Sequence, residues 1–265
     1  MRIMFVGTSS NAGKTTIAAM FCRYLRSKAV MVSPFKAFNM SSKSFMTENG
    51  EMGIGQAVQA WASDIKPNVR MNPVLVKVAG GKLKTIVNGE ERNDLDRNSL
   101  FEHALSSFDE ICERYDAVVA EGSGSPAEIN LRGSDIANAR FARSRKIPMI
   151  LIGNIEKGGV FAGIYGTWLL MEKEDRDLMK GFIINKYYGD DGILKSGIEE
   201  IEALTGMKCF GILPYMKIML PEEDAGDGVQ CSEDNIDTFV SQLDKLLEEV
   251  SGRLDLEGIM KAASE

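Results

Sequence analysis

The chain alternates short apolar segments with segments in which apolar residues recur at helical spacing. The apolar segments are nearly continuous rather than alternating, which is typical of parallel strands buried on both faces of a sheet. The predicted strands are Ile3–Gly7, Val30–Pro34, Ala117–Glu121, Pro148–Gly153, Gly181–Asn185 and Phe210–Pro214. Helical periodicity fills the intervals between them, so we predict an α/β fold with a doubly wound, mainly parallel sheet and helices on both faces.

The helical pattern is clearest after the first strand, where the apolar side chains between Ile17 and Leu25 fall on one face. Further helices are expected at residues 100–112, 135–144, 160–171, 193–205 and 235–250. Residues 74–78 and 83–89 flank Gly80-Gly81 and predict a β-hairpin, which we expect at an edge of the sheet. No repeat or linker interrupts the chain, so we predict one domain over residues 1–250 and a polar tail at residues 251–265.

A phosphate-binding loop stands between the first strand and the first helix. Residues 7–15 read Gly-x5-Gly-Lys-Thr, one residue longer than the usual Walker A spacing, in the strand–loop–helix context that this motif requires. Gly13 allows backbone N–H groups to face phosphate oxygens, Lys14 is expected to reach the β- and γ-phosphates, and the Thr15 hydroxyl to bind Mg²⁺. The predicted nucleotide-binding residues of the loop are Gly7, Thr8, Asn11, Ala12, Gly13, Lys14, Thr15 and Thr16.

An acidic residue, Glu121, ends the third predicted strand and precedes a glycine-rich loop. Ligands in open α/β sheets bind at the carboxyl ends of the strands, so we predict that Glu121 is a Mg²⁺ ligand. Three other nucleotide-binding classes fit less well. The chain lacks the Asp of an Asn-Lys-x-Asp GTPase motif after Asn185, it lacks the early lysine of the ParA and MinD loop, and protein kinases do not place Gly-Lys-Thr at a helix start.

Charge and composition narrow the chemistry further. The formal net charge is −7, which disfavours nucleic acid as a partner, and no apolar run reaches the ~18 residues that cross a bilayer. The four cysteines fit neither a zinc site nor a disulfide framework, so we expect free thiols in a cytoplasmic protein. His103 is the only histidine. The reaction must therefore depend on lysines, carboxylates, backbone amides and a metal held by oxygen.

Several separated motifs occur together and in order. They are Gly7–Lys14, Pro34–Met40, Gln56–Ala60, Met71–Leu75, Glu121–Arg132, Asp135–Asn138, Gly158–Ala162 and Lys180–Lys186. Over residues 2–225 the chain resembles the N-terminal synthetase domain of the cobyric acid synthases, whose members resemble dethiobiotin synthetase in fold. The resemblance implies ATP-dependent activation of carboxylates as acyl phosphates, followed by displacement of phosphate by ammonia. In that family the reaction occurs at four peripheral carboxylates of adenosylcobyrinic acid a,c-diamide, a corrinoid.

The resemblance also implies roles for single residues. Lys36 matches a lysine that serves the transition state and contacts the γ-phosphate or the substrate carboxylate. Glu51 resembles a second acidic Mg²⁺ ligand, with an exposed loop carboxylate as the alternative. Asn185 stands where the wider fold reads the purine edge, and Pro214 closes the next strand near the same base or merely ends that strand. The predicted substrate contacts are Lys36, Asn39, Ser123, Ser125, Glu128, Asn130, Arg132 and Lys157.

Departures from the family pattern affect the substrate and the ammonia source. Asn154, Glu156 and Lys157 stand where we expect Asp, Asp and Arg, and Phe38 stands where we expect Gln. The chain shows no cysteine elbow or His-x-Glu pair of a glutaminase, so we expect ammonia from a separate glutaminase subunit or from solution. Two alternatives stay open: a related ligase of the dethiobiotin synthetase or a,c-diamide synthase type, and a nucleotide-dependent regulatory subunit. Related enzymes often dimerise, so a homodimer is also considered.

Overall fold

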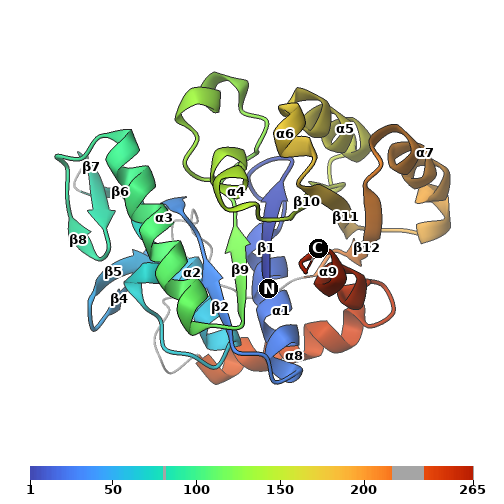
Figure 1. Cartoon of the computed structure of the whole chain (residues 1–265). Helices are drawn as coiled ribbons and strands as arrows, with labels where there is room; N and C mark the ends of the chain where they lie inside the picture. The colour runs from blue at the N-terminus through green and yellow to red at the C-terminus, as the bar shows by residue number, and fades with distance from the viewer. Residues whose placement is uncertain (80–81, 217–235, 265) are drawn as a thin grey trace. The chain divides into compact units, whose positions relative to one another are not determined.

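The structure is a computed structural model that describes residues 1–79, 82–216 and 236–264 (Figure 1). Its contacts divide the chain into two compact units. The first unit comprises Met1–Lys14, Gly122–Lys217 and Glu249–Glu265, and the second comprises Thr15–Glu121 and Ile218–Glu248.

Four parallel strands form the sheet of the first unit, in the order β12-β11-β10-β1. Their bounds are Lys208–Pro214, Met179–Tyr187, Met149–Asn154 and Arg2–Gly7, respectively. Four consecutive side chains of β1, from Ile3 to Val6, are fully buried. A strand with no exposed face cannot show polar alternation, which is why the apolar runs predicted these strands correctly.

Helices follow the strands of the first unit and shield them. They are α4 (Ala139–Arg145), α5 (Val160–Leu170), α6 (Lys173–Arg176), α7 (Lys195–Thr205) and α9 (Leu256–Ala262), with the 3₁₀ turns η2 (Ile129–Ser134) and η3 (Asp191–Leu194). Residues 251–265, expected as a tail, include α9. Asp255 N donates to Phe210 O (2.7 Å), and Ile259 of α9 is fully buried, so this segment packs on β12.

The second unit contains two further parallel strands, β2 (Val32–Phe35) and β9 (Ala117–Glu121). Three helices of this unit are α2 (Ile54–Ala62), α3 (Arg97–Arg114) and α8 (Ile236–Val250), and α1 (Lys14–Ser27) begins at the last residue of the first unit's opening segment. The rings of Phe35 and Phe108 meet edge to face at 5.0 Å, and Trp61 stacks on Phe239 at 6.4 Å. These aromatic contacts bind α3 to β2 and α8 to α2.

The predicted hairpin belongs to a separate sheet of the second unit. Its strands β6 (Val74–Ala79) and β7 (Lys82–Val87) pair antiparallel, and the sheet order is β3-β6-β7-β8, with β3 at Phe38–Met40 and β8 at Glu90–Glu91. The hairpin is confirmed, but it does not extend an edge of the parallel sheet, because the short strand β3 pairs with β6 instead. Its Gly80-Gly81 turn and Asn235 of the last predicted helix lie outside the described residues.

A second antiparallel pair, β4 (Ser44–Thr47) with β5 (Gly50–Gly53), precedes α2 and was not predicted. The α/β class with a mainly parallel sheet is confirmed. Of the helices in the described part of the chain, none combines the length and the apolar character needed to cross a membrane.

Candidate nucleotide and metal site

The turn after β1 is shaped by its backbone. Gly13 has φ +100°, a conformation that side-chain-bearing residues rarely adopt, and a Cβ there would lie 2.1 Å from Asn185 Nδ2. That same nitrogen donates to Ala12 O at 2.9 Å, and Asn185 is buried. Lys14 Nζ donates to Ser9 O at 3.0 Å, while Thr8 N donates to Ile152 O at 3.0 Å. The backbone of this loop is thus held in a defined turn by contacts within the loop and with Ile152 and Asn185.

The structure therefore brings together the loop residues of the first unit that the sequence singled out. Gly7 ends β1, Asn11 takes a left-handed φ of +57°, and Ala12 is fully buried. Asn185 meets this loop through its amide, whereas its predicted contact with a purine stays a prediction. Pro214 ends β12, opposite Tyr187 in the register.

Glu121 organises the matching part of the second unit. It ends β9 and is almost completely buried. Its Oε1 accepts a hydrogen bond from Thr15 Oγ1 at 2.8 Å and forms an ion pair with Lys36 Nζ at 3.1 Å. The Lys36 residue is only 3% exposed. The structure thus joins the three side chains that the sequence predicted for metal and phosphate chemistry.

The second oxygen of Glu121 is held by two amides of α2. Gln59 Nε2 donates to Oε2 at 2.7 Å and Gln56 Nε2 at 3.3 Å, and both glutamines are fully buried. Asn39 Nδ2 donates in turn to Gln56 Oε1 at 3.3 Å. Gln56 and Gln59 belong to the motif Gln56–Ala60, but the sequence alone indicates no role for them. The available signal was two polar side chains three residues apart in an otherwise apolar helix.

Asn72 fixes the position of Lys36. Its Nδ2 donates to Lys36 O at 3.0 Å and to Val74 O at 3.2 Å, while its Oδ1 accepts from Gly53 N at 2.9 Å. A Cβ on Gly53 would lie 2.8 Å from Asn72 Oδ1 and 2.3 Å from Asn39 Nδ2, so only glycine allows this approach. One buried amide therefore ties the lysine to the start of α2 and to β6. Asn72 is also a residue that the sequence analysis left without a role.

Glu51 lies in a different set of contacts. Its Oε1 accepts hydrogen bonds from Ser44 Oγ and Lys77 Nζ. Burial raises the pKa of the Glu51 carboxyl, but the bonds from Lys77 and Ser44 and the charge of Lys77 outweigh this and hold the pKa below its usual range. The carboxylate is therefore ionised and already paired in the second unit, and its Mg²⁺ role stays a prediction.

The predicted substrate residues of the first unit form no single cluster. Ser125 is buried and its Oγ accepts from Ala127 N at 3.2 Å, whereas Glu128, Asn130, Arg132 and Lys157 are exposed. Arg132 Nη2 donates to Leu170 O. Exposed side chains are available for an external ligand, but their geometry does not by itself select one.

The loop after Glu121 is held by Asn138, which sequence reasoning also left without a role. Asn138 Oδ1 accepts from Ser123 N at 3.1 Å, and its Nδ2 donates to Ser123 O at 2.7 Å. Asp135 Oδ1 accepts from Asn138 N at 3.0 Å and sets the start of this turn. The motif Asp135–Asn138 thus acts as a clamp on residues 123–125, and Ser123 keeps a defined backbone position.

The oxygen atoms at Glu121 suit a hard divalent cation. Within the described ranges no group of three or more His, Cys, Asp or Glu side chains could hold a metal ion. Mg²⁺ rarely needs such a group, because it keeps several waters and binds one or two protein oxygens together with nucleotide phosphates. Thr15 Oγ1 and Glu121 Oε1 are oxygens of this kind, so the residues present fit a nucleotide-bound Mg²⁺.

Thiol chemistry is disfavoured at Cys22 and Cys209. Burial raises the pKa of Cys22 to about 12, and burial likewise raises the pKa of Cys209 to about 11. A thiol with such a pKa is almost wholly protonated at neutral pH and is a weak nucleophile. This agrees with the expectation that the chemistry depends on oxygen and nitrogen groups. Cys231 lies outside the described residues.

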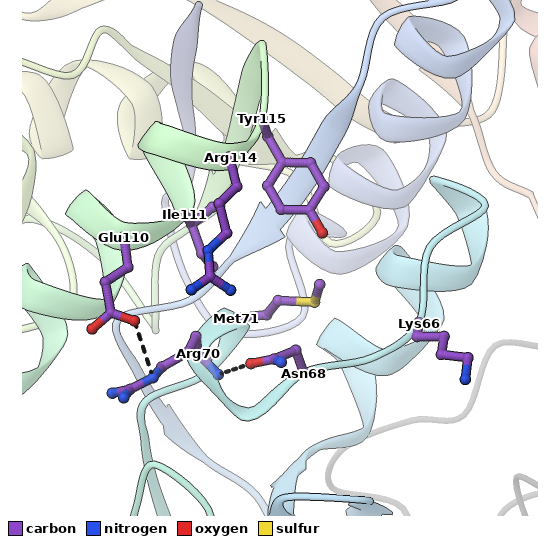
Figure 2. A pocket seen from close by; sticks show the side chains of 8 residues that line it. All are labelled: Lys66, Asn68, Arg70, Met71, Glu110, Ile111, Arg114 and Tyr115. Carbon is purple, nitrogen blue, oxygen red and sulfur yellow. Dashed lines mark hydrogen bonds and ion pairs between the residues drawn. The ribbon is translucent and has the colours of Figure 1, made fainter.

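A surface cavity of about 220 Å³ lies in the second unit at the end of α3 (Figure 2). Figure 2 shows Arg70 in an ion pair with Glu110 (3.4 Å) and its backbone bonded to Asn68 (2.9 Å). The lining residues are Lys66, Asn68, Arg70, Met71, Glu110, Ile111, Arg114 and Tyr115. None of the residues predicted for nucleotide, metal or substrate lines this cavity, so it is not the candidate site.

Comparison with known proteins agrees with this arrangement. Residues 3–225 match the family model described as CobQ/CobB/MinD/ParA nucleotide binding domain. The chain is 43% identical over 258 residues to cobyric acid synthase of Limosilactobacillus reuteri, covering 92% of this chain and 52% of the relative. It is 44% identical over 232 residues to cobyric acid synthase of Salmonella gallinarum, covering 84% of this chain and 46% of the relative. The chain thus spans about half the length of these curated relatives.

Solved structures resemble the chain in fold alone. The MinD cell division protein of Aquifex aeolicus matches with a TM-score of 0.50 at 14% identity, over 99% of this chain and 94% of that protein. Its fold agrees with the α/β architecture. The match over residues 3–225 shows that the chain belongs to the CobQ/CobB/MinD/ParA nucleotide-binding domain family.

Proposed function

We propose that this chain is the ATP-dependent part of an amide ligase that converts adenosylcobyrinic acid a,c-diamide to cobyric acid. The relatives named cobyric acid synthase support this proposal, since two of them share 43% and 44% identity with the chain. The family match over residues 3–225 contains the phosphate loop, Lys36 and Glu121. The substrate, the use of ATP and the number of amidations belong to the proposal.

The observation that carries the proposal is the buried contact of Lys36 with Glu121 Oε1, beside the Thr15 hydroxyl. A protein that only binds and releases a nucleotide needs a phosphate loop and a metal site. Lys36 adds a second buried ammonium group to Lys14 of the loop. Phosphoryl transfer depends mainly on neutralising charge around the transferred group, and a second lysine serves an additional anion such as a substrate carboxylate.

In the proposed reaction a carboxylate oxygen of the corrinoid attacks the γ-phosphorus of ATP. The bond from that phosphorus to the β,γ-bridging oxygen breaks, and ADP leaves. Ammonia then attacks the acyl carbon, inorganic phosphate departs with the bonding electrons of the acyl–oxygen bond, and one proton is released. Lys14 and Lys36 bind the phosphoryl oxygens and the incoming carboxylate, and no side chain becomes covalently modified.

Mg²⁺, bound by Thr15 and Glu121, would neutralise phosphate charge during the transfer. Residues 123–132, with Asn39 and Lys157, are proposed to contact the corrinoid. A separate glutaminase or free ammonia would supply nitrogen, and a homodimer is compatible with the proposal. None of these partners is needed for the test below if ammonium is supplied.

The test is mass spectrometry of the corrinoid after incubation with the protein, ATP, Mg²⁺ and ammonium chloride. Each amidation replaces a hydroxyl by an amino group, and we expect one ADP for each replacement. Lys36→Met is expected to lower the rate by about 10²–10³-fold, because a charge contact to the transferred group is lost. Lys84→Met, which alters an exposed ion pair with Glu91, is the matched control and should leave the rate unchanged.

An unchanged corrinoid with a folded, nucleotide-binding protein would contradict the proposed substrate. Amidation of cobyrinic acid itself, or carboxylation of a diaminononanoate, would instead identify one of the related ligases. ATP-dependent binding to another protein without turnover would favour a regulatory subunit.

A further inference from the structure

The two oxygens of the Glu121 carboxylate have chemically different partners. Oε1 meets Thr15 Oγ1 and the Lys36 ammonium, whereas Oε2 accepts from two neutral amide groups, at 2.7 Å from Gln59 and 3.3 Å from Gln56. Amide donors fix the orientation of a carboxylate without cancelling its charge. Oε1 is consequently the oxygen directed at cations, and Oε2 is the oxygen that holds the side chain in place.

Gln59 has a second connection to the same place. Its Nε2 lies 3.4 Å from Thr15 O, in the first turn of α1. One side chain therefore contacts both residues whose side-chain oxygens fit a Mg²⁺ ion: it bonds to Oε2 of the Glu121 carboxylate and to the backbone oxygen of Thr15. Gln56 is farther from Oε2 and shares its carbonyl oxygen with Asn39. The two glutamines are thus not equivalent, although both are fully buried.

The carbonyl oxygen of Gln59 is buried and has no hydrogen-bond partner among the residues that the structure describes. An unmatched buried acceptor lowers the stability of a folded protein, so such an atom calls for a hydrogen-bond partner. The neighbours of Gln59, Glu121 Oε2 and Thr15 O, are acceptors themselves and cannot supply a proton. A water that hydrates a bound Mg²⁺ is a strong donor, and Mg²⁺ characteristically keeps several waters.

We propose that Gln59 is a positioning residue of the Mg²⁺ site. Its amide nitrogen holds Glu121 so that Oε1 faces the ion, and its carbonyl oxygen accepts a hydrogen bond from a water that hydrates the ion. Gln56 supports the first of these tasks only. The inference rests on the proposed function in one respect, the use of a magnesium nucleotide, and requires neither the corrinoid nor amide formation.

The test is direct binding of Mn²⁺, an ion that accepts the same oxygen ligands. Electron paramagnetic resonance reports free Mn²⁺ during titration of the protein saturated with ADP. Gln59→Leu removes both the amide nitrogen and the carbonyl oxygen of this side chain at nearly constant volume. We expect it to weaken Mn²⁺ binding by about 10–100-fold, as loss of other outer partners of metal ligands does. Gln56→Leu is the matched control from the same helix face and should weaken Mn²⁺ binding clearly less.

Affinity for metal-free ADP separates positioning from general damage. It should be unchanged in Gln59→Leu, because the phosphate loop is not altered. In turnover assays the Mg²⁺ concentration for half-maximal activity should rise, while kcat at saturating Mg²⁺ falls less. If Gln59→Leu fails to fold, Gln59→Asn keeps an amide but shortens its reach, and the same weakening is expected from it.

Wild-type Mn²⁺ affinity in a folded Gln59→Leu or Gln59→Asn protein would overturn the inference, and so would equal losses in the Gln56 and Gln59 variants. Failure of the wild-type protein to bind Mn²⁺ with ADP would overturn both this inference and the proposed function. Normal metal binding without amidation of the corrinoid would overturn only the proposed function.

Discussion

The phosphate loop of the first unit and the Glu121 cluster of the second unit are built in opposite ways. The loop consists of consecutive residues, and its shape comes from backbone dihedral angles, with the distant side chain of Asn185 packed against it. The Glu121 cluster consists of five side chains from four separate segments: residue 15, residue 36, residues 56 and 59 of α2, and residue 121. The shape of the loop therefore depends on the lack of a side chain at Gly13. The shape of the Glu121 cluster depends on which side chains are present.

The largest expected effect concerns the buried charge pair. Glu121→Gln leaves Lys36 buried without its counter-charge and should lower the free energy of unfolding by about 3–5 kcal/mol. The double variant Lys36→Met/Glu121→Gln removes both charges and should recover much of that loss. Urea unfolding of the four proteins in this cycle measures the coupling.

The exposed pair Lys84–Glu91, 2.7 Å apart in the same unit, provides the control. Its coupling should be about 0.2–1 kcal/mol, because solvent screens exposed ion pairs. Equal coupling in the two cycles would show that burial does not distinguish the Glu121 cluster from an ordinary surface contact.

A smaller effect is expected in the loop. Gly13→Ala places a methyl group 2.1 Å from Asn185 Nδ2 at φ +100°, and we expect a loss of about 1–3 kcal/mol together with weaker nucleotide binding. Gly124→Ala is the comparison, since Gly124 has φ +62° but no atom within 4 Å of the added carbon. It should cost only the backbone strain. Urea unfolding and titration with a fluorescent ATP analogue give the two values, and similar results for both variants would contradict the importance of the Asn185 contact.

The smallest effect concerns Glu51. Its pKa is lowered in the folded state, so its ion pair stabilises the protein above the pKa of the unfolded carboxyl, and this contribution is lost as the pH falls through the folded pKa. Glu51→Gln should therefore lower stability by about 1 kcal/mol at pH 7, and the difference from wild type should vanish at acid pH. Thermal unfolding from pH 7 to pH 3 measures this. Mn²⁺ affinity of the same variant tests the magnesium role predicted for Glu51.

The comparison also explains what could be predicted from the sequence. The phosphate loop was predictable because Gly13, Lys14 and Thr15 are consecutive and follow a buried strand. Lys36 and Glu121 were each predictable as site residues as well, because each stands at the carboxyl end of a short apolar strand. In these cases local pattern and strand direction suffice.

The remaining contacts were not predictable, because they depend on which strands pair. The three residues of β3 are too few to show a period, so its pairing with β6 left no signal, and the hairpin was assigned to the wrong sheet. Lys77 could not be matched to Glu51 without that sheet. Gln56 and Gln59 gave a local signal, but their shared acceptor, Glu121, lies 62 residues after Gln59. Only the folded chain identifies this acceptor.

The three hydrogen bonds of Asn72 have a consequence for protein engineering. They hold the backbone of Lys36, the entrance to α2 at Gly53 and the start of β6 at Val74. Introducing Lys36 alone into another α/β protein would therefore add an ammonium group without the hydrogen bond from Asn72 that fixes its backbone. A design that introduces this lysine elsewhere should also introduce Asn72 and Gly53, because these residues bond to each other and Asn72 bonds to the Lys36 backbone.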